Sequence, residues 1–180
     1  MSIDGKDFVR GVPLLNIELG GGNYPLYHPN IDLALSPTVD IAHDLTQGIP
    51  LPDNYADLIF SRDFIEHLSF PKFIFLLTDC KRVLRNEGRI EFITPDVEKA
   101  LFTHSWWNEY THHVVIGDDS VFRSGHWDSG NSCLRHRIWF SPELMRYILE
   151  KENWQVVSIE DYKKDDDWWK EPKMRVIATK

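Results

Sequence analysis

The sequence has little of what marks secreted or membrane proteins. Its 180 residues contain only two cysteines, Cys80 and Cys133, which form neither a disulfide framework nor a metal-binding spacing. No apolar run approaches the roughly 20 residues that a membrane helix needs, and the N-terminus lacks the apolar core of a signal peptide. A reducing cytoplasm is therefore the expected location, with no membrane partner.

Positive charge is also scarce. The chain has 20 Lys and Arg against 28 Asp and Glu, which gives a net charge of −8. Proteins that bind nucleic acids usually carry a basic stripe on one face, and none is visible here. The charge therefore disfavours DNA or RNA as a substrate and favours a small molecule, and it leaves the oligomeric state open.

One glycine-rich stretch organises the chain. Residues 14–19 are mostly apolar, contain Glu18 and are followed directly by three glycines at 20–22. Such a run is typical of a buried parallel strand, whose terminal glycines let the backbone turn beside a ligand. The dinucleotide fingerprint is absent, because Pro25 stands where its third glycine belongs. Glu18 favours a positively charged ligand such as S-adenosylmethionine, and a glycine turn without a ligand is the alternative.

The remaining pattern alternates strands with helices, which is typical of an α/β protein. Helices are expected at 70–85, stopped by residues 86–88 with Gly88 free to take a positive φ, and after the capping residue Ser141. Only about ten residues separate the first two strands, so this crossover is expected to be a loop or one helical turn. We expect a single domain, residues 1–180, with strands at 13–19, 30–35, 39–45, 56–61, 89–94, 154–159 and 174–179.

Residues 97–135 lack regular periodicity and are rich in histidine and tryptophan, including Trp106, Trp107 and Trp127. A stretch of this length inside a domain is usually functional or flexible. Loops at strand ends commonly close over substrates and exclude water. We therefore expect residues 97–135 to form a cap over the active-site cleft.

Five short motifs follow one another between about Leu14 and Ile159. They are ELGGG at 18–22, DL at 44–45 ahead of IPLPDNYADLI at 49–59, EHL at 66–68, RVLRNEGR at 82–89 and WFSPEL at 139–144. Their order and spacing resemble a class I S-adenosylmethionine-dependent methyltransferase of the type-11 kind. The resemblance implies a Rossmann-like sheet of seven mostly parallel strands with an antiparallel last strand.

The resemblance also implies where S-adenosylmethionine binds, along the carboxyl ends of the first four strands. The residues expected to hold it are Glu18, Leu19, Gly20, Gly21 and Gly22 at the methionine end, Asp32 at the ribose, Asp44 and Leu45 at the adenine, and Ser61 near the methyl group. Two features depart from the family: Tyr24 stands where a further glycine is usual, and the helix after the loop is shortened, which reduces its dipole support for the cofactor carboxylate. We interpret both as a variant of a working site.

Methyl transfer needs an aligned nucleophile and, for some acceptors, removal of a proton. Asp63, Glu66 and His67 share one face if the turn that holds them is helical, and His136 lies shortly before the late helix. We expect Glu66, His67 and His136 to be catalytic, with a structural role as the other hypothesis for Glu66. Together with Asp63, these residues are also similar to the divalent-metal ligands of methyltransferases that act on RNA 3′ ends or catechol-like compounds. Those families have a glutamate at the position of Asp63.

The sequence therefore predicts an S-adenosylmethionine-dependent methyltransferase acting on an oxygen or nitrogen of a small molecule, such as a sugar or another metabolite. One alternative is a metal-assisted methyltransferase acting on RNA or a catechol-like acceptor. Another is a regulatory module that binds the cofactor without turnover, which the Tyr24 departure favours.

Overall fold

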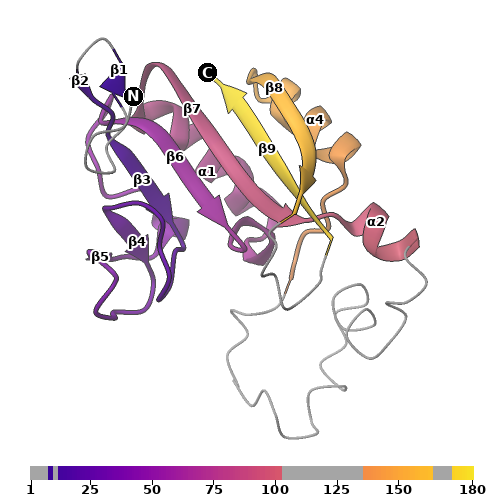
Figure 1. Cartoon of the computed structure of the whole chain (residues 1–180), viewed down its shortest axis with the longest axis horizontal. Coiled ribbons are helices and arrows are strands. Elements are labelled where there is room, and N and C mark those ends of the chain that lie inside the picture. Colours follow the sequence, from indigo (N-terminus) through magenta and orange to yellow (C-terminus); the bar gives the residue numbers. More distant parts are fainter. Residues whose placement is uncertain (1–7, 10–11, 103–135, 164–171) are drawn as a thin grey trace, which may run out of the picture.

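The computed structural model describes residues 8–9, 12–102, 136–163 and 172–180. Seven strands form one sheet in the order β5-β4-β3-β6-β7-β9-β8 (Figure 1). The strands are β3 (Asn16–Leu19), β4 (Asn30–Asp32), β5 (Ile41–Ala42), β6 (Ala56–Arg62), β7 (Leu84–Pro95), β8 (Gln155–Tyr162) and β9 (Lys173–Thr179). Strands β3 to β7 are parallel, and β9 runs antiparallel to both β7 and β8. This arrangement confirms the expected sheet with its antiparallel last strand.

Near the N-terminus, β1 (Phe8–Val9) and β2 (Val12–Pro13) form a separate antiparallel pair. Helix α2 (Val97–Phe102) follows β7 and begins the stretch that was expected to be a cap. The rest of that stretch, residues 103–135 with their tryptophans, lies outside the described residues, so the cap remains a prediction. Among the described residues, no helix has the length and apolar character needed to cross a membrane.

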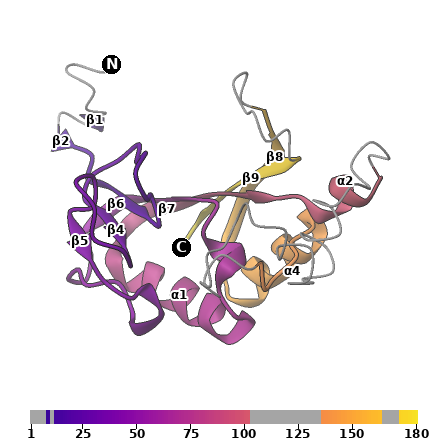
Figure 2. The same ribbon diagram turned by 90° about the horizontal axis from the view of Figure 1, so that it is seen from below.

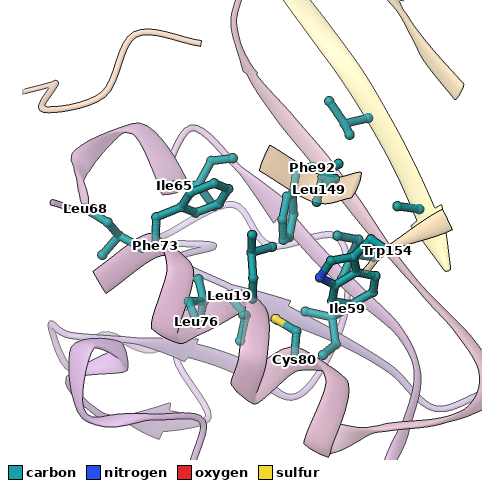
Figure 3. Close-up of a cluster of buried hydrophobic side chains, with 14 of the residues drawn as sticks. Leu19, Ile59, Ile65, Leu68, Phe73, Leu76, Cys80, Phe92, Leu149 and Trp154 are labelled. Carbon is teal, nitrogen blue, oxygen red and sulfur yellow. The ribbon is translucent and has the colours of Figure 1, made fainter. Parts of the chain in front are cut away.

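Helices α1 (Phe70–Val83) and α4 (Pro142–Lys151) pack on the same face of the sheet, which Figure 2 shows from the side. The buried residues of α1 recur at helical spacing, and Ser141 caps α4 by accepting a hydrogen bond from the Leu144 N–H, as predicted. Between the helices and the sheet lies the main core (Figure 3), which includes Leu19, Ile59, Ile65, Phe73, Leu76, Cys80, Phe92, Leu149 and Trp154.

The opposite face of the sheet is covered by neither α1 nor α4. Its apolar part is a smaller cluster of Leu58, Phe60 and Ile93, each 2% exposed. Farther along, the face becomes polar, and the Arg175 side chain bridges Glu91 and Glu160. Only the apolar part of this face needs to be covered by other residues, because ion pairs tolerate contact with water.

The connection from β3 to β4 supplies part of that cover. Residues 20–29 contain no helix, which confirms the expected reduction of the first crossover to a loop. The Tyr27 ring packs edge-on against Phe60, with 5.4 Å between the ring centroids. The Glu18 Oε2 atom accepts hydrogen bonds from the N–H groups of Leu26 at 2.5 Å and Tyr27 at 2.9 Å. A buried carboxylate thus anchors the loop over the face where a crossover helix ordinarily packs.

The end of α1 differs from the expectation. The helix stops at Val83, and the extended Leu84 begins β7 at once. Positive φ occurs at Glu87, with 66°, and not at Gly88, so the prediction for Gly88 was wrong. Gly88 is needed for space instead, because a Cβ atom there would lie 2.9 Å from the Arg85 carbonyl oxygen.

The second and third strands are shorter than predicted. Strand β4 ends at Asp32, and β5 has only the residues Ile41–Ala42. The expected continuation to residue 45 is wrong because Asp44 instead caps a short 3₁₀ helix, η1 (Leu45–Gln47). Its side chain satisfies a free backbone N–H at the start of that helix, which is the usual role of aspartate at this position.

Candidate functional site

The glycine loop lies just beyond the carboxyl end of β3 and is fixed by side chains from β4. Gly20 and Gly22 have φ values of 70° and 53°, which favour glycine. The Asn30 side chain accepts from the Gly21 N–H at 3.1 Å and donates to the Gly22 carbonyl at 3.1 Å. Asp32 Oδ2 accepts from the Gly22 N–H at 3.0 Å. The loop is therefore held in one conformation by the first and last residues of β4.

Two buried polar atoms at the strand ends have no hydrogen-bond partner within the described protein, Glu18 Oε1 and Ser61 Oγ. Their residues are 0% and 1% exposed. A buried polar atom without a partner costs about 1–3 kcal/mol, so a ligand group is the natural partner for each. Register places Leu19 opposite Ser61, and side chains alternate along a strand, so Glu18 and Ser61 approach the strand ends from opposite faces.

Burial raises the pKa of Glu18 above its ordinary value, and the N–H groups of Tyr27 and Leu26 oppose that rise. A cation placed at the free Oε1 atom favours the ionised carboxylate. Next to it, a Cβ atom added at Gly22 would meet nothing within 4 Å. Glu18, Gly22 and Ser61 thus fit a ligand that carries positive charge and lies across the strand ends.

The residues expected at the adenine and ribose have partners of their own. Asp44 Oδ1 accepts from the Thr46 N–H at 2.9 Å, and hydrogen bonds from the Thr46 side chain and backbone lower the pKa of Asp44. The Asp32 carboxylate also binds the Ala34 N–H, at 3.2 Å. Each carboxylate retains acceptor capacity for a ligand, since an ionised carboxylate has about four acceptor sites.

Leu19 and Leu45 are 0% and 4% exposed, and both side chains pack in the main core. Their predicted contact with the cofactor therefore depends on their backbone atoms. Tyr24, the departure from the family pattern, has a side chain that is 82% exposed, so it does not fill the loop. Its carbonyl oxygen accepts a hydrogen bond from Arg62 Nη2 at 3.1 Å.

The segment after β6 packs directly on the glycine loop. A Cβ atom added at Gly20 would lie 2.5 Å from Phe64 Cγ, so the Phe64 ring occupies the place of a side chain there. The 3₁₀ helix η2 (Ile65–His67) follows Phe64 immediately. This contact brings Glu66 and His67 beside the loop that fits the cofactor.

Glu66, His67 and His136 gather into one group, with one potential ligand atom from each lying within 4.8 Å of the others. The rings of His67 and His136 meet at 71°, with centroids 4.9 Å apart. The backbone holds this arrangement together, because the N–H groups of Arg137 and Ile138 donate to the Glu66 carbonyl at 2.7 and 3.1 Å. The structure thus brings together the three residues that the sequence singled out as catalytic.

The Glu66 side chain is 2% exposed and accepts a hydrogen bond from the Thr94 hydroxyl at 3.1 Å. Asp63 does not join the group. It precedes η2 with a φ of 53°, and its carboxylate binds Lys173 Nζ at 2.9 Å. The condition for Asp63 to share a face with Glu66 and His67 is therefore not met, because the turn is not helical at Asp63.

Three residues that position this site, Asn30, Phe64 and Thr94, were not predicted from the sequence. Asn30 is 0% exposed, and a polar residue directly before the apolar Ile31 was the available signal. Phe64 and Thr94 look like ordinary strand and turn residues in the sequence. Their contacts with Gly20 and Glu66 arise only from the folded arrangement.

Comparisons with known proteins agree with this arrangement. A family model for a methyltransferase domain of type 11 matches residues 29–92. No curated protein was matched by sequence. Among solved structures, a SAM-dependent methyltransferase from Aquifex aeolicus is 20% identical, with a TM-score of 0.54, and the match covers 92% of this chain and 81% of that one.

Two further structures share the fold. A SAM-dependent methyltransferase from Archaeoglobus fulgidus is 15% identical, with a TM-score of 0.62 and coverage of 92% of this chain and 85% of that one. The 1,6-didemethyltoxoflavin-N1-methyltransferase of Burkholderia thailandensis, solved with 1,6-didemethyltoxoflavin and S-adenosylhomocysteine, is 12% identical, with a TM-score of 0.62 and coverage of 93% and 71%.

The family match includes β4, β5, β6 and α1, and ends within β7. The strands on either side of it complete the class I sheet order. Residues 29–92 thus match a methyltransferase domain, and the sheet that they share with the neighbouring strands has the fold of the class I S-adenosylmethionine-dependent methyltransferases.

Proposed function

We propose that this enzyme methylates an oxygen or nitrogen of a small-molecule acceptor, such as a sugar or another metabolite. The observation that carries the proposal is the group of Glu66, His67 and His136, gathered at the carboxyl edge of the sheet beside the glycine loop. A site of this composition suits acceptors whose nucleophile is a hydroxyl or an amine, because such a group gives up a proton on methylation.

We place the cofactor across the ends of β3, β4 and β6. S-adenosylmethionine supplies a methyl group activated by the positive charge on its sulfur. Glu18 Oε1 and Ser61 Oγ are the buried atoms that offer it a hydrogen-bonding partner. Asp32 and Asp44, at the ends of β4 and β5, provide carboxylates for the ribose and adenine.

The chain then has two tasks at the acceptor. The first is alignment, since displacement at a methyl carbon requires the nucleophile in line with the leaving sulfur. The second is handling the acceptor proton, for which positioned imidazole and carboxylate groups contribute roughly 10²- to 10⁴-fold in rate. His67, His136 and Glu66 are the groups that we assign to the second task, and the cap formed by residues 97–135 would exclude water.

The charge of the chain supports a small acceptor over a nucleic acid. The net charge is −8, and the phosphates of RNA or DNA are bound chiefly by lysine and arginine. The proposal of a module without turnover depended on Tyr24. The exposed Tyr24 side chain leaves the glycine loop clear, so it gives that alternative no support.

The test is methyl transfer from S-adenosylmethionine carrying a tritiated methyl group to a cell extract separated into metabolites, RNA and protein. We expect label in the metabolite fraction and its loss by roughly 10²-fold or more with His67→Ala. His43→Ala, a substitution of a partly exposed histidine after β5, is the matched control and should leave transfer unchanged. Label in the RNA or protein fraction alone would refute the proposed acceptor class.

A further inference from the structure

We propose that Glu66, His67 and His136 bind one divalent transition-metal ion, and that this ion holds an acceptor through two neighbouring oxygen atoms. The inference rests on the proposed function, because it says how the same group would handle the acceptor proton: an ion held by the three residues would lower the pKa of an acceptor hydroxyl bound to it, in place of proton transfer to an imidazole. It has a chemical readout of its own, since metal binding is measured without any methyl transfer.

The distances suit a single ion. One potential donor atom from each residue lies within 4.8 Å of the others. Ligand atoms about 2.1 Å from a shared ion and on one side of it lie about 3.0–3.4 Å apart. Rotation of the two imidazoles would bring the three donor atoms to this spacing, and both histidines are only partly buried, which leaves room for that rotation.

The backbone holds the ligands in place before any ion arrives. His136 comes from a segment distant in sequence, yet residues 137 and 138 are hydrogen-bonded to the carbonyl of Glu66 itself. Glu66 and His67 are adjacent in η2, where the His67 N–H donates to the Phe64 carbonyl at 3.0 Å. Two of the ligands therefore cannot separate from the third without breaking backbone hydrogen bonds.

A partner also stands behind the carboxylate. The Thr94 hydroxyl, on β7, donates to Glu66 Oε2 at 3.1 Å. Such partners orient metal ligands, and their loss typically lowers metal affinity by roughly 10- to 100-fold. Glu66 is 2% exposed, and a buried carboxylate is stabilised by a neighbouring cation.

The donor set indicates the class of metal. Imidazole nitrogen favours zinc, iron, cobalt, nickel and related ions, whereas calcium and magnesium prefer oxygen ligands alone. Two histidines and one carboxylate on one side of an ion leave its other positions open. Two neighbouring oxygens of an acceptor fit two such positions, which predicts a vicinal diol or catechol arrangement rather than an isolated hydroxyl.

The experiment titrates the metal-free protein with Co²⁺, followed by visible absorption, and with Zn²⁺, followed by calorimetry. We expect one ion per chain. His67→Ala and His136→Ala should each lose more than the roughly 10- to 100-fold in affinity that removal of an outer partner costs. The loss of metal affinity in Thr94→Val should be roughly 10- to 100-fold. His43→Ala should bind the metal as tightly as the wild type.

Glu66→Gln keeps the shape of the buried side chain and should also weaken metal binding. Binding of S-adenosylhomocysteine to every variant shows that the variant is folded and tests the cofactor site separately. If the ion binds equally well to the wild type and both histidine variants, or does not bind while S-adenosylhomocysteine does, the metal site is refuted and the methyltransferase proposal stands.

The acceptor class has its own probe. Catechol, with adjacent hydroxyls, should shift the absorption of the Co²⁺-loaded protein, whereas resorcinol, whose hydroxyls are one carbon farther apart, should not. Equal shifts with both compounds, or with neither, would overturn the assignment of an acceptor held through two neighbouring oxygens.

Discussion

The contact between Gly20 and Phe64 makes a quantitative prediction about the glycine loop. In Gly20→Ala, the new methyl group would lie 2.5 Å from Phe64 Cγ, in a backbone conformation with φ of 70°. The left-handed conformation costs a non-glycine residue about 1–2 kcal/mol. Forcing an extra carbon against a packed ring costs a further 1–3 kcal/mol or so. We therefore expect the free energy of unfolding to fall by about 2–5 kcal/mol.

Gly22→Ala is the matched control, because Gly22 has φ of 53° but no atom near the added carbon. It should pay only the conformational cost of about 1–2 kcal/mol. Urea unfolding of both variants measures the difference. A double-mutant cycle then isolates the contact, since Phe64→Ala should reduce the effect of Gly20→Ala to that of Gly22→Ala. Equal losses in the two single variants, or no rescue by Phe64→Ala, would refute the packing account.

Three further predictions concern the cofactor and the cap. Asp44→Ala should weaken S-adenosylhomocysteine binding by about 1–3 kcal/mol in calorimetry, whereas Asp53→Ala should not; equal effects would show that the adenine site is misplaced. Folding raises the pKa of Glu18, so the stability that protonated Glu18 contributes should be lost as the pH rises from 4.5 through the folded-state pKa. Urea unfolding at a series of pH values should show this loss in the wild type and not in Glu18→Gln. Cofactor should increase amide protection in residues 97–135, and unchanged exchange would remove support for the cap.

The parts of the fold that the sequence predicted are those with a repeating pattern. Helices α1 and α4 follow from apolar spacing and from Pro71 and Pro142 at their starts. The sheet strands follow from apolar runs, and the early end of β5 was missed because capping by Asp44 overrides the run. The positive φ predicted for Gly88 was wrong because a glycine can be required either by a positive φ or by lack of room for a Cβ atom, and the sequence does not distinguish the two.

The candidate site was predictable in residue type and only partly in geometry. The motif around Glu66 and His67 marked the correct turn, but the diversion of Asp63 to Lys173 depends on a contact 110 residues away. The placement of His136 depends on hydrogen bonds from residues 137 and 138 to Glu66, for which no periodicity exists. Long-range contacts between irregular segments leave no local pattern, so these positions required the folded structure.

Binding of S-adenosylhomocysteine tests the central claim most directly. We expect one molecule bound per chain and a stabilisation of about 2.7 kcal/mol when the ligand is at 100 times its dissociation constant, seen as a raised melting temperature. NAD at the same concentration should have no comparable effect, because the loop lacks the dinucleotide fingerprint. Absence of S-adenosylhomocysteine binding at millimolar concentration, or equal stabilisation by NAD, would contradict the account.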